Sequence, residues 1–232
     1  MIGTSLSHTI TAVPPKLIIF DFDGTLVETE ALVAQIISSK LAELGRTVSP
    51  ADIAATLAGV PRAQEVTLLE TLATVSLPER FMEEVDVEWR EAILAGVAPT
   101  AGTVDALTTL RIPFCVASNA TRKDLILRMR SAKIFNLIGP RFFSSHDLGL
   151  HKPDPAVFLL AAEAMGVQPS ECLVIEDSVT GLEAARRAKM RSCAFIGAAH
   201  QSERMHSALQ SCEPDGFLWR ISDLAQILHE AV

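Results

Sequence analysis

Residues 17–25 read Leu-Ile-Ile-Phe-Asp-Phe-Asp-Gly-Thr, and this stretch decides the predicted fold. Four apolar residues followed by two carboxylates and a glycine predict a buried β-strand that ends in a turn. Because alternate residues of an extended strand point the same way, Asp21 and Asp23 are expected to face one site. Two like charges so close together are costly unless a cation lies between them or one is protonated. Taken alone, the pattern also suits a solvated turn, so its interpretation depends on the rest of the chain.

The composition of the 232-residue chain is that of a globular protein with a large core, since 49% of the residues are hydrophobic and 21% are charged. No apolar run approaches the roughly 20 residues that a membrane-spanning helix needs. The formal charge of −8, without Lys/Arg-rich runs, argues against nucleic acids and anionic membranes as partners. Because the first cationic residue is Lys16, no signal peptide is expected, and the cytoplasm is the predicted location. Nothing in the sequence demands more than a monomer, so a monomer is predicted.

Residues 27–97 show helical periodicity and no strand pattern. An apolar stripe with helical spacing runs along the first helix and stops before Gly45; it consists of Val33, Ile37, Leu41 and Leu44. Capping and turn signals predict three more helices, at about 50–57, 62–75 and 78–94. We therefore expect residues 27–97 to form an insertion of four helices in the core.

From residue 98 onward, the chain alternates between helices and apolar strands. This alternation predicts a Rossmann-like α/β core with a parallel sheet and helices on both faces. After the first strand, further strands are expected at 112–117, 142–143, 173–175 and 193–196, with an edge strand at 216–219. The core is predicted to comprise residues 16–26 and 98–232, and residues 1–15 are predicted to be a loosely ordered tail.

Polar and charged residues follow three of the predicted strands, at the edge where such sheets bind ligands. They are Asp21 and Asp23 after the first strand, Ser118 and Asn119 after the second, and Glu176 and Asp177 after a later one, with Lys152 just before a helix start. Carboxylates, completed by water and substrate oxygens, are typical ligands of Mg²⁺. Hydroxyl, amide and helix N-terminal N–H groups are typical donors to an anion. The set therefore predicts a hard divalent cation together with a phosphate group.

These motifs, in this order, resemble those of the haloacid dehalogenase-like superfamily, in particular its beta-phosphoglucomutase and sugar-phosphate phosphatase branch. The resemblance covers residues 16 to about 200. Its motifs are Asp21-Phe-Asp23-Gly-Thr-Leu, Ser118-Asn119, Lys152-Pro-Asp-Pro155 and Glu176-Asp177-Ser-Val-Thr-Gly181. The helical insertion is similar to the small four-helix cap of that branch. The resemblance implies a Mg²⁺-dependent phosphatase that acts on a small phosphorylated metabolite, a sugar or sugar-acid phosphate, through an aspartyl-phosphate.

The resemblance also implies a role for each matching carboxylate. Asp21 would attack phosphorus, and Asp23 would protonate the leaving oxygen and then activate water. Asp21, Asp177 and the backbone carbonyl of Asp23 would ligate Mg²⁺, with Glu176 ligating it directly or through water. These roles agree with elementary chemistry, because carboxylate nucleophiles are an established route to covalent phosphoenzymes and phosphoryl transfer depends mainly on positioning and charge neutralisation.

The remaining matches imply contacts to the substrate. Ser118, Asn119 and Lys152 would hold the transferring phosphoryl group. Arg62 follows Gly-Val-Pro in the predicted cap, where related enzymes place residues that contact the distal part of the substrate. Arg62 is therefore a candidate substrate-binding residue, although an ordinary helix arginine that extends along the surface is the alternative interpretation.

Four other functions are compatible with parts of this pattern. A phosphomutase of the beta-phosphoglucomutase type would carry a histidine on the first cap helix, where this chain has Val33, and residues 27–97 contain no histidine. A dehalogenase uses no metal and usually lacks the aspartate at position 23. A phosphonate-cleaving enzyme would need a cap lysine, for which Lys40 is the one candidate. A non-catalytic regulator that binds metal and phosphate is the alternative from another class, and the complete catalytic set argues against it.

Overall fold

The computed structural model describes residues 5–6, 13–57, 60, 62–198, 201–224 and 228. These residues form a seven-stranded sheet in the order β1-β7-β6-β5-β2-β3-β4. Six of the described strands are parallel: β2 (Leu17–Phe20), β3 (Phe114–Ser118), β4 (Phe142–Ser144), β5 (Cys172–Glu176), β6 (Arg191–Phe195) and β7 (Gly216–Leu218). The predicted α/β fold with a parallel sheet is confirmed.

The first strand, β1 (Ser5–Leu6), pairs antiparallel with β7. It lies within the segment predicted to be a loosely ordered tail; residues 1–4 and 7–12 of that segment lie outside the described residues. Because β1 borders β7, the strand predicted at the sheet edge has a neighbour on each side. The strand predicted from Ile112 begins at Phe114, since Pro113 has no N–H group with which to continue the ladder.

Helices cover both faces of the sheet and bury its central strands. The described helices beyond residue 100 are α6 (Thr103–Thr109), α7 (Arg122–Ser131), α8 (Phe135–Ile138), α9 (Ala156–Ala164), α10 (Val179–Arg187) and α11 (Glu203–Gln210), with 3₁₀ turns η1 (His146–Leu148) and η2 (Pro169–Glu171). Successive residues of β2 point to opposite faces. Ile18 and Phe20 pack with residues of α6 and α7, whereas Leu17 and Ile19 pack with residues of α9 and α10.

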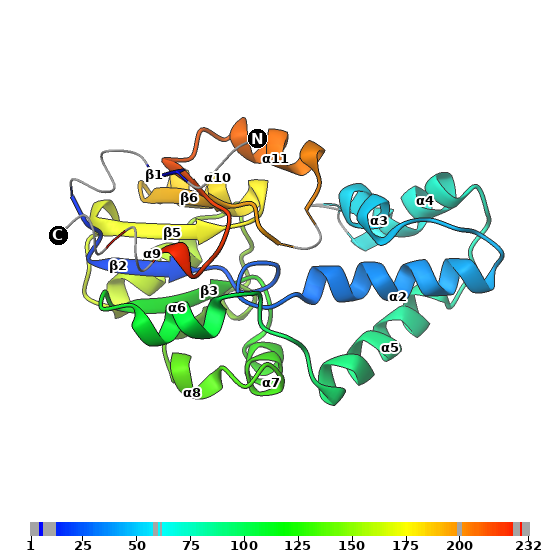
Figure 1. Ribbon diagram of the computed structural model, residues 1–232, viewed down its shortest axis with the longest axis horizontal. Helices are drawn as coiled ribbons and strands as arrows, with labels where there is room; N and C mark the ends of the chain where they lie inside the picture. The colour runs from blue at the N-terminus through cyan, green and yellow to red at the C-terminus, as the bar shows by residue number, and fades with distance from the viewer. Residues whose placement is uncertain are drawn as a thin grey trace.

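Four helices occupy the described part of the chain between β2 and α6: α2 (Thr29–Glu43), α3 (Pro50–Leu57), α4 (Arg62–Ala73) and α5 (Phe81–Ala95). They lie beyond the carboxyl ends of β2 and β5 (Figure 1). Ile37 and Leu41 of the predicted stripe belong to a hydrophobic cluster formed by these helices alone, whereas Leu44, at the end of the stripe, is exposed. The four predicted helices are confirmed, and the domain bounds at residues 27 and 97 stay a prediction.

The two segments that connect these helices to the sheet run side by side. Val27 forms isolated bridges with Asp23 and with Pro99, and Thr100 N–H donates to the carbonyl of Leu26 over 2.9 Å. The start of α2 is therefore held next to the turn that carries Asp23. Among the described residues, no helix is both long and apolar enough to cross a bilayer.

Candidate active site

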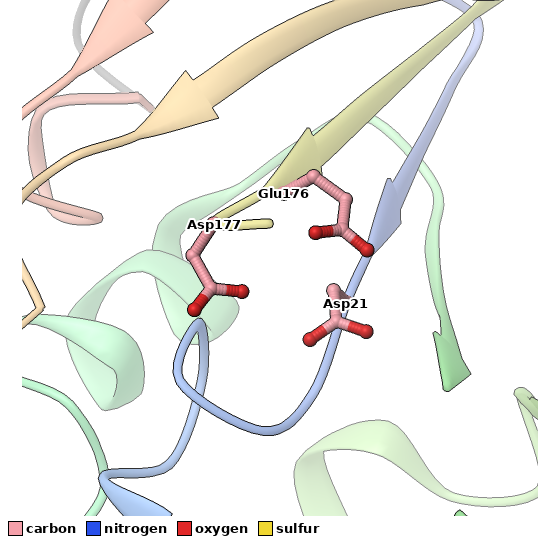
Figure 2. A group of neighbouring side chains, drawn as sticks. All are labelled: Asp21, Glu176 and Asp177. Atoms are coloured by element: carbon pink, nitrogen blue, oxygen red, sulfur yellow. The ribbon is translucent and has the colours of Figure 1, made fainter. Parts of the chain in front are cut away.

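Three buried carboxylates meet where β2 and β5 end. In the parallel pairing of these strands Phe20 lies opposite Ile175, so Asp21 and Glu176, the next residues, are neighbours. Among the described residues, Asp21, Glu176 and Asp177 each offer one oxygen within 4.8 Å of the others. Their side chains point toward one another (Figure 2), and Thr25 Oγ1 donates to Asp177 Oδ1 over 3.1 Å.

Lys152 provides the positive charge next to this group. Its Nζ donates to Asp21 Oδ1, to Glu176 Oε1 over 2.7 Å and to the carbonyl of Ala117 over 2.9 Å, which uses all three ammonium protons. Burial opposes the charge of Lys152, but the two carboxylates outweigh burial and raise its pKa. The ion pairs therefore keep Lys152 protonated although it is only 6% exposed.

The electrostatics of Asp21 indicate that a second cation would fit. Burial raises the pKa of Asp21 well above its ordinary value, and Glu176 and Asp177 act in the same direction, while Lys152 opposes them. One lysine thus leaves an excess of negative charge among three carboxylates. Oxygen ligands and excess negative charge are the conditions under which a hard divalent ion binds. The residues present therefore fit a Mg²⁺ ion.

Asn119 positions the loop that carries Lys152. Its Oδ1 accepts from the backbone N–H of Lys152 over 2.9 Å and from Ser145 Oγ over 2.6 Å. Ser118, the last residue of β3, is buried, and its Oγ accepts from the N–H of Ala120 over 3.1 Å. The structure places Ser118 and Asn119 beside Lys152 on the wall of one cavity. The carboxamide oxygen of Asn119 is occupied, so its NH₂ group is the donor that it can offer to a phosphate.

Asp23 lines the same cavity, but its carboxylate does not belong to the group formed by Asp21, Glu176 and Asp177. Thr29 Oγ1 donates to Asp23 Oδ1, and Arg128 Nη1 donates to Asp23 Oδ2, each over 2.7 Å. Strand β2 ends at Phe20, and the chain turns from Gly24 onward, where the glycine adopts a positive φ of 82°.

Arg128 of α7 is a site residue that the sequence analysis missed. Its guanidinium lies over the ring of Trp89 of α5, with 4.6 Å between Cζ and the ring centroid. The ion pair with Asp23 is largely shielded, since 13% of the arginine side chain and 17% of the aspartate side chain are exposed. In the sequence, the one local feature of Arg128 is that it directly precedes Met129, which is buried. No spacing along the sequence indicates that Arg128 pairs with Asp23.

The cavity has a volume of about 490 Å³ and extends from the carboxylates to α3 and α11. Its wall contains every predicted core-site residue, as well as Arg204 of α11, which the sequence analysis missed. Arg62 is not part of this wall. The Arg62 guanidinium instead pairs with Asp86 over 2.6 Å and with Glu65 over 2.7 Å, on the surface of the inserted helices. The proposed substrate contact of Arg62 therefore stays a prediction.

Comparisons with known proteins agree with this geometry. A 6-phosphogluconate phosphatase of Escherichia coli (strain K12) is 26% identical to the chain over 192 residues, 82% of this chain and 87% of that protein. A fructose-1-phosphate phosphatase of the same strain is 31% identical over 181 residues, 75% of this chain and 92% of that protein. A HAD family hydrolase from Deinococcus radiodurans R1, solved with bound phosphate and sodium, is 30% identical with a TM-score of 0.86, covering 94% of this chain and 97% of that one. The sequence profile of the haloacid dehalogenase-like hydrolases matches residues 15–189, and the chain belongs to this family.

Proposed function

We propose that this protein is a Mg²⁺-dependent phosphatase that hydrolyses a sugar or sugar-acid phosphate through an aspartyl-phosphate on Asp21. The observation that carries the proposal is the convergence of Asp21, Glu176 and Asp177, all buried, around the ammonium of Lys152. The relatives named above, which are phosphatases of a sugar-acid phosphate and of a sugar phosphate, support the substrate class.

The proposed reaction has two steps. In the first, a carboxylate oxygen of Asp21 forms a bond to phosphorus, the bond between phosphorus and the ester oxygen breaks, and Asp23 gives its proton to that oxygen. In the second, Asp23 takes a proton from water as the water oxygen forms a bond to phosphorus, and the bond between phosphorus and the Asp21 oxygen breaks, which releases inorganic phosphate and restores the Asp21 carboxylate. Asp21, Asp177 and the Asp23 carbonyl would hold Mg²⁺, with Glu176 binding directly or through water; when bound, the ion would neutralise charge on the phosphoryl oxygens.

The remaining residues bind and orient. The ammonium of Lys152 keeps a positive charge beside the Asp21 oxygen that attacks, and its ion pairs fix that oxygen in place. Ser118 and the NH₂ group of Asn119 would donate to the phosphoryl oxygens from the end of β3. Thr29 and Arg128 hold the carboxylate of Asp23 from two sides, and each oxygen keeps a further lone pair that can carry the catalytic proton.

Magnesium removal tests the proposal directly. The protein should release p-nitrophenol from p-nitrophenyl phosphate in the presence of Mg²⁺, and excess EDTA should lower the rate by about 100-fold or more. Renewed Mg²⁺ should restore the rate, which separates metal loss from denaturation. If no Mg²⁺-dependent release occurs between about pH 5 and pH 9, while the protein still binds inorganic phosphate, the non-catalytic regulator is the better interpretation.

Arg128→Met tests whether the ion pair orients the general acid. Alkyl phosphates need a proton on the leaving oxygen, whereas p-nitrophenolate leaves without one. We therefore expect kcat for a sugar phosphate to fall about tenfold or more, while kcat for p-nitrophenyl phosphate changes less than about twofold. Arg130→Met is the matched control, because Arg130 lies on the same helix and stacks on Phe135. An equal loss on both substrates would show that Arg128 acts through stability alone.

A further inference from the structure

Apart from the residues at the strand ends, the described wall of the cavity is mostly apolar. Its apolar residues come from α3, from the start of α10 and from α11: Ala54, Ala55, Leu57, Val179, Met205, Ala208 and Leu209. In Figure 1 the helices α3 and α11 both lie in the upper half of the view. A substrate whose phosphate lies at Asp21 has to place the rest of its body along this wall. The charged side chains there therefore decide which substrate body is accepted.

The described wall of the cavity carries more carboxylates than basic side chains. Among the described residues that line the cavity, the carboxylates are Asp21, Asp23, Glu30, Glu176 and Asp177, and the basic side chains are Lys152 and Arg204. The ammonium of Lys152 already donates to three protein oxygens. Arg204 is exposed, and its guanidinium makes no hydrogen bond or ion pair with another described residue. Arg204 is thus the basic group on this wall that has donors to offer.

The position of Arg204 in α11 is unfavourable for the helix itself. It is the second residue of the helix, where the positive end of the helix dipole repels a cation. The cap is provided by Ser202, which accepts from the N–H of Met205 over 3.4 Å, so the arginine is not needed there. A residue that breaks a local rule without a compensating contact is a candidate for a functional role. Arg62, by contrast, has its guanidinium neutralised by Asp86 and Glu65.

We propose that Arg204 binds a carboxylate at the end of the substrate opposite to the phosphate, so that the preferred substrate is the phosphate ester of a sugar acid. This inference rests on the proposed function and adds a specificity residue to it. The planar guanidinium matches a carboxylate with two parallel hydrogen bonds. A carboxylate adds one negative charge and meets one unpaired guanidinium, whereas a second phosphate would add about two charges to an already acidic cavity.

The test compares two open-chain substrates of equal length, 6-phosphogluconate and sorbitol 6-phosphate, which differ at the end remote from the phosphate. The wild-type protein should show kcat/KM about tenfold or more higher for 6-phosphogluconate. Arg204→Gln should abolish this preference by raising KM for 6-phosphogluconate at nearly unchanged kcat. The reason is that the lost contact to the carboxylate is equally strong in the bound substrate and in the transition state. Arg204→Lys should recover part of the preference. Turnover of p-nitrophenyl phosphate, which has no carboxylate, should change far less in both variants than turnover of 6-phosphogluconate.

Arg62→Gln is the matched control and also tests the earlier hypothesis for Arg62. If Arg204 reads the carboxylate, Arg62→Gln leaves the preference intact. The proposal is overturned if Arg204→Gln keeps the wild-type preference, if the wild-type protein has none, or if Arg62→Gln abolishes it instead. A second phosphate, rather than a carboxylate, would be the group that Arg204 binds if two results were found together. The wild-type protein would show a higher kcat/KM for fructose 1,6-bisphosphate than for 6-phosphogluconate, and Arg204→Gln would lose this difference.

Calorimetry separates a failure of this inference from a failure of the proposed function. The dissociation constants of 6-phosphogluconate and sorbitol 6-phosphate can be measured for the Asp21→Asn protein, in which turnover is blocked, and for Asp21→Asn combined with Arg204→Gln. The carboxylate should tighten binding about tenfold in the first protein and have no effect in the second. This result would support the role of Arg204 even if p-nitrophenyl phosphate were not hydrolysed. The role would be refuted if 6-phosphogluconate and sorbitol 6-phosphate bound with equal affinity to the Asp21→Asn protein as well as to the double variant.

Discussion

Asp21→Asn is expected to lower turnover of any phosphate ester by about 10⁴-fold or more, because an amide oxygen cannot form the proposed aspartyl-phosphate. Mass spectrometry of the acid-quenched reaction should find phosphate on the peptide containing Asp21 in the wild-type protein and none in the variant. Asp105→Asn, at an exposed position of α6, is the control and should leave turnover unchanged. Turnover near the wild-type rate in Asp21→Asn would refute the nucleophile assignment.

The same variant should be more stable than the wild-type protein at neutral pH in EDTA. Burial raises the pKa of Asp21 in the folded state above its value in the unfolded chain. The contribution of Asp21 to stability is therefore fully present below its unfolded pKa of about 4 and decreases as the pH rises toward the folded pKa. We expect a higher urea midpoint for Asp21→Asn at pH 7, with an advantage that shrinks on acidification toward pH 4. A lower midpoint at pH 7 would contradict the raised pKa.

Lys152→Met is expected to lower the free energy of unfolding by about 3–5 kcal/mol in EDTA, because it leaves two buried carboxylates without their cation. Glu176 is fully buried and Asp21 is 7% exposed, so water solvates these two carboxylates poorly once the ammonium is removed. Urea denaturation followed by circular dichroism measures the loss. Catalysis should disappear as well, since the charge next to the attacking oxygen is removed.

Two further variants make this expectation specific. Lys16→Met breaks the Lys16–Glu171 pair, whose side chains are 68% and 36% exposed, and should change stability far less than Lys152→Met, because water and salt screen an exposed pair. Combining Lys152→Met with Glu176→Gln removes one of the stranded charges and should recover part of the lost stability. If Lys152→Met costs no more than Lys16→Met, the buried network does not carry the stability assigned to it.

The location of the site could be predicted because short stretches of neighbouring residues indicate where each strand ends. An apolar run followed by acids predicts a strand end, and parallel strands place their carboxyl ends at one edge of the sheet. That reasoning brought together Asp21, Glu176 and Asp177, and the structure places their carboxylates side by side. The four helices between β2 and α6 were predictable for the same reason, since periodicity and capping signals depend on residues a few positions apart.

The side-chain partners could not be predicted in this way. Asp23 was expected to face the same site as Asp21, and both line the cavity, but the sequence did not indicate that Thr29 and Arg128, which is 105 positions away, hold its carboxylate. Only the packing of α5 and α7 places Trp89 against Arg128 and directs the guanidinium toward Asp23. Likewise, the turn sequence before Arg62 suggested a substrate contact, but Asp86 on another helix neutralises its charge.

The sequence by itself therefore determined the α/β fold, the strand ends that carry the polar residues, and the residues Asp21, Glu176, Asp177 and Lys152 as a group. The tertiary structure decided which of the guanidiniums of Arg62, Arg128 and Arg204 are paired and which one lines the cavity, because ion pairs between distant segments depend on how helices pack and not on sequence spacing. It assigned Arg128 to Asp23, engaged Arg62 at the surface and left Arg204 on the cavity wall. The acid motif at the end of β2 determines where a phosphate would react, and helix packing determines what else the substrate has to carry.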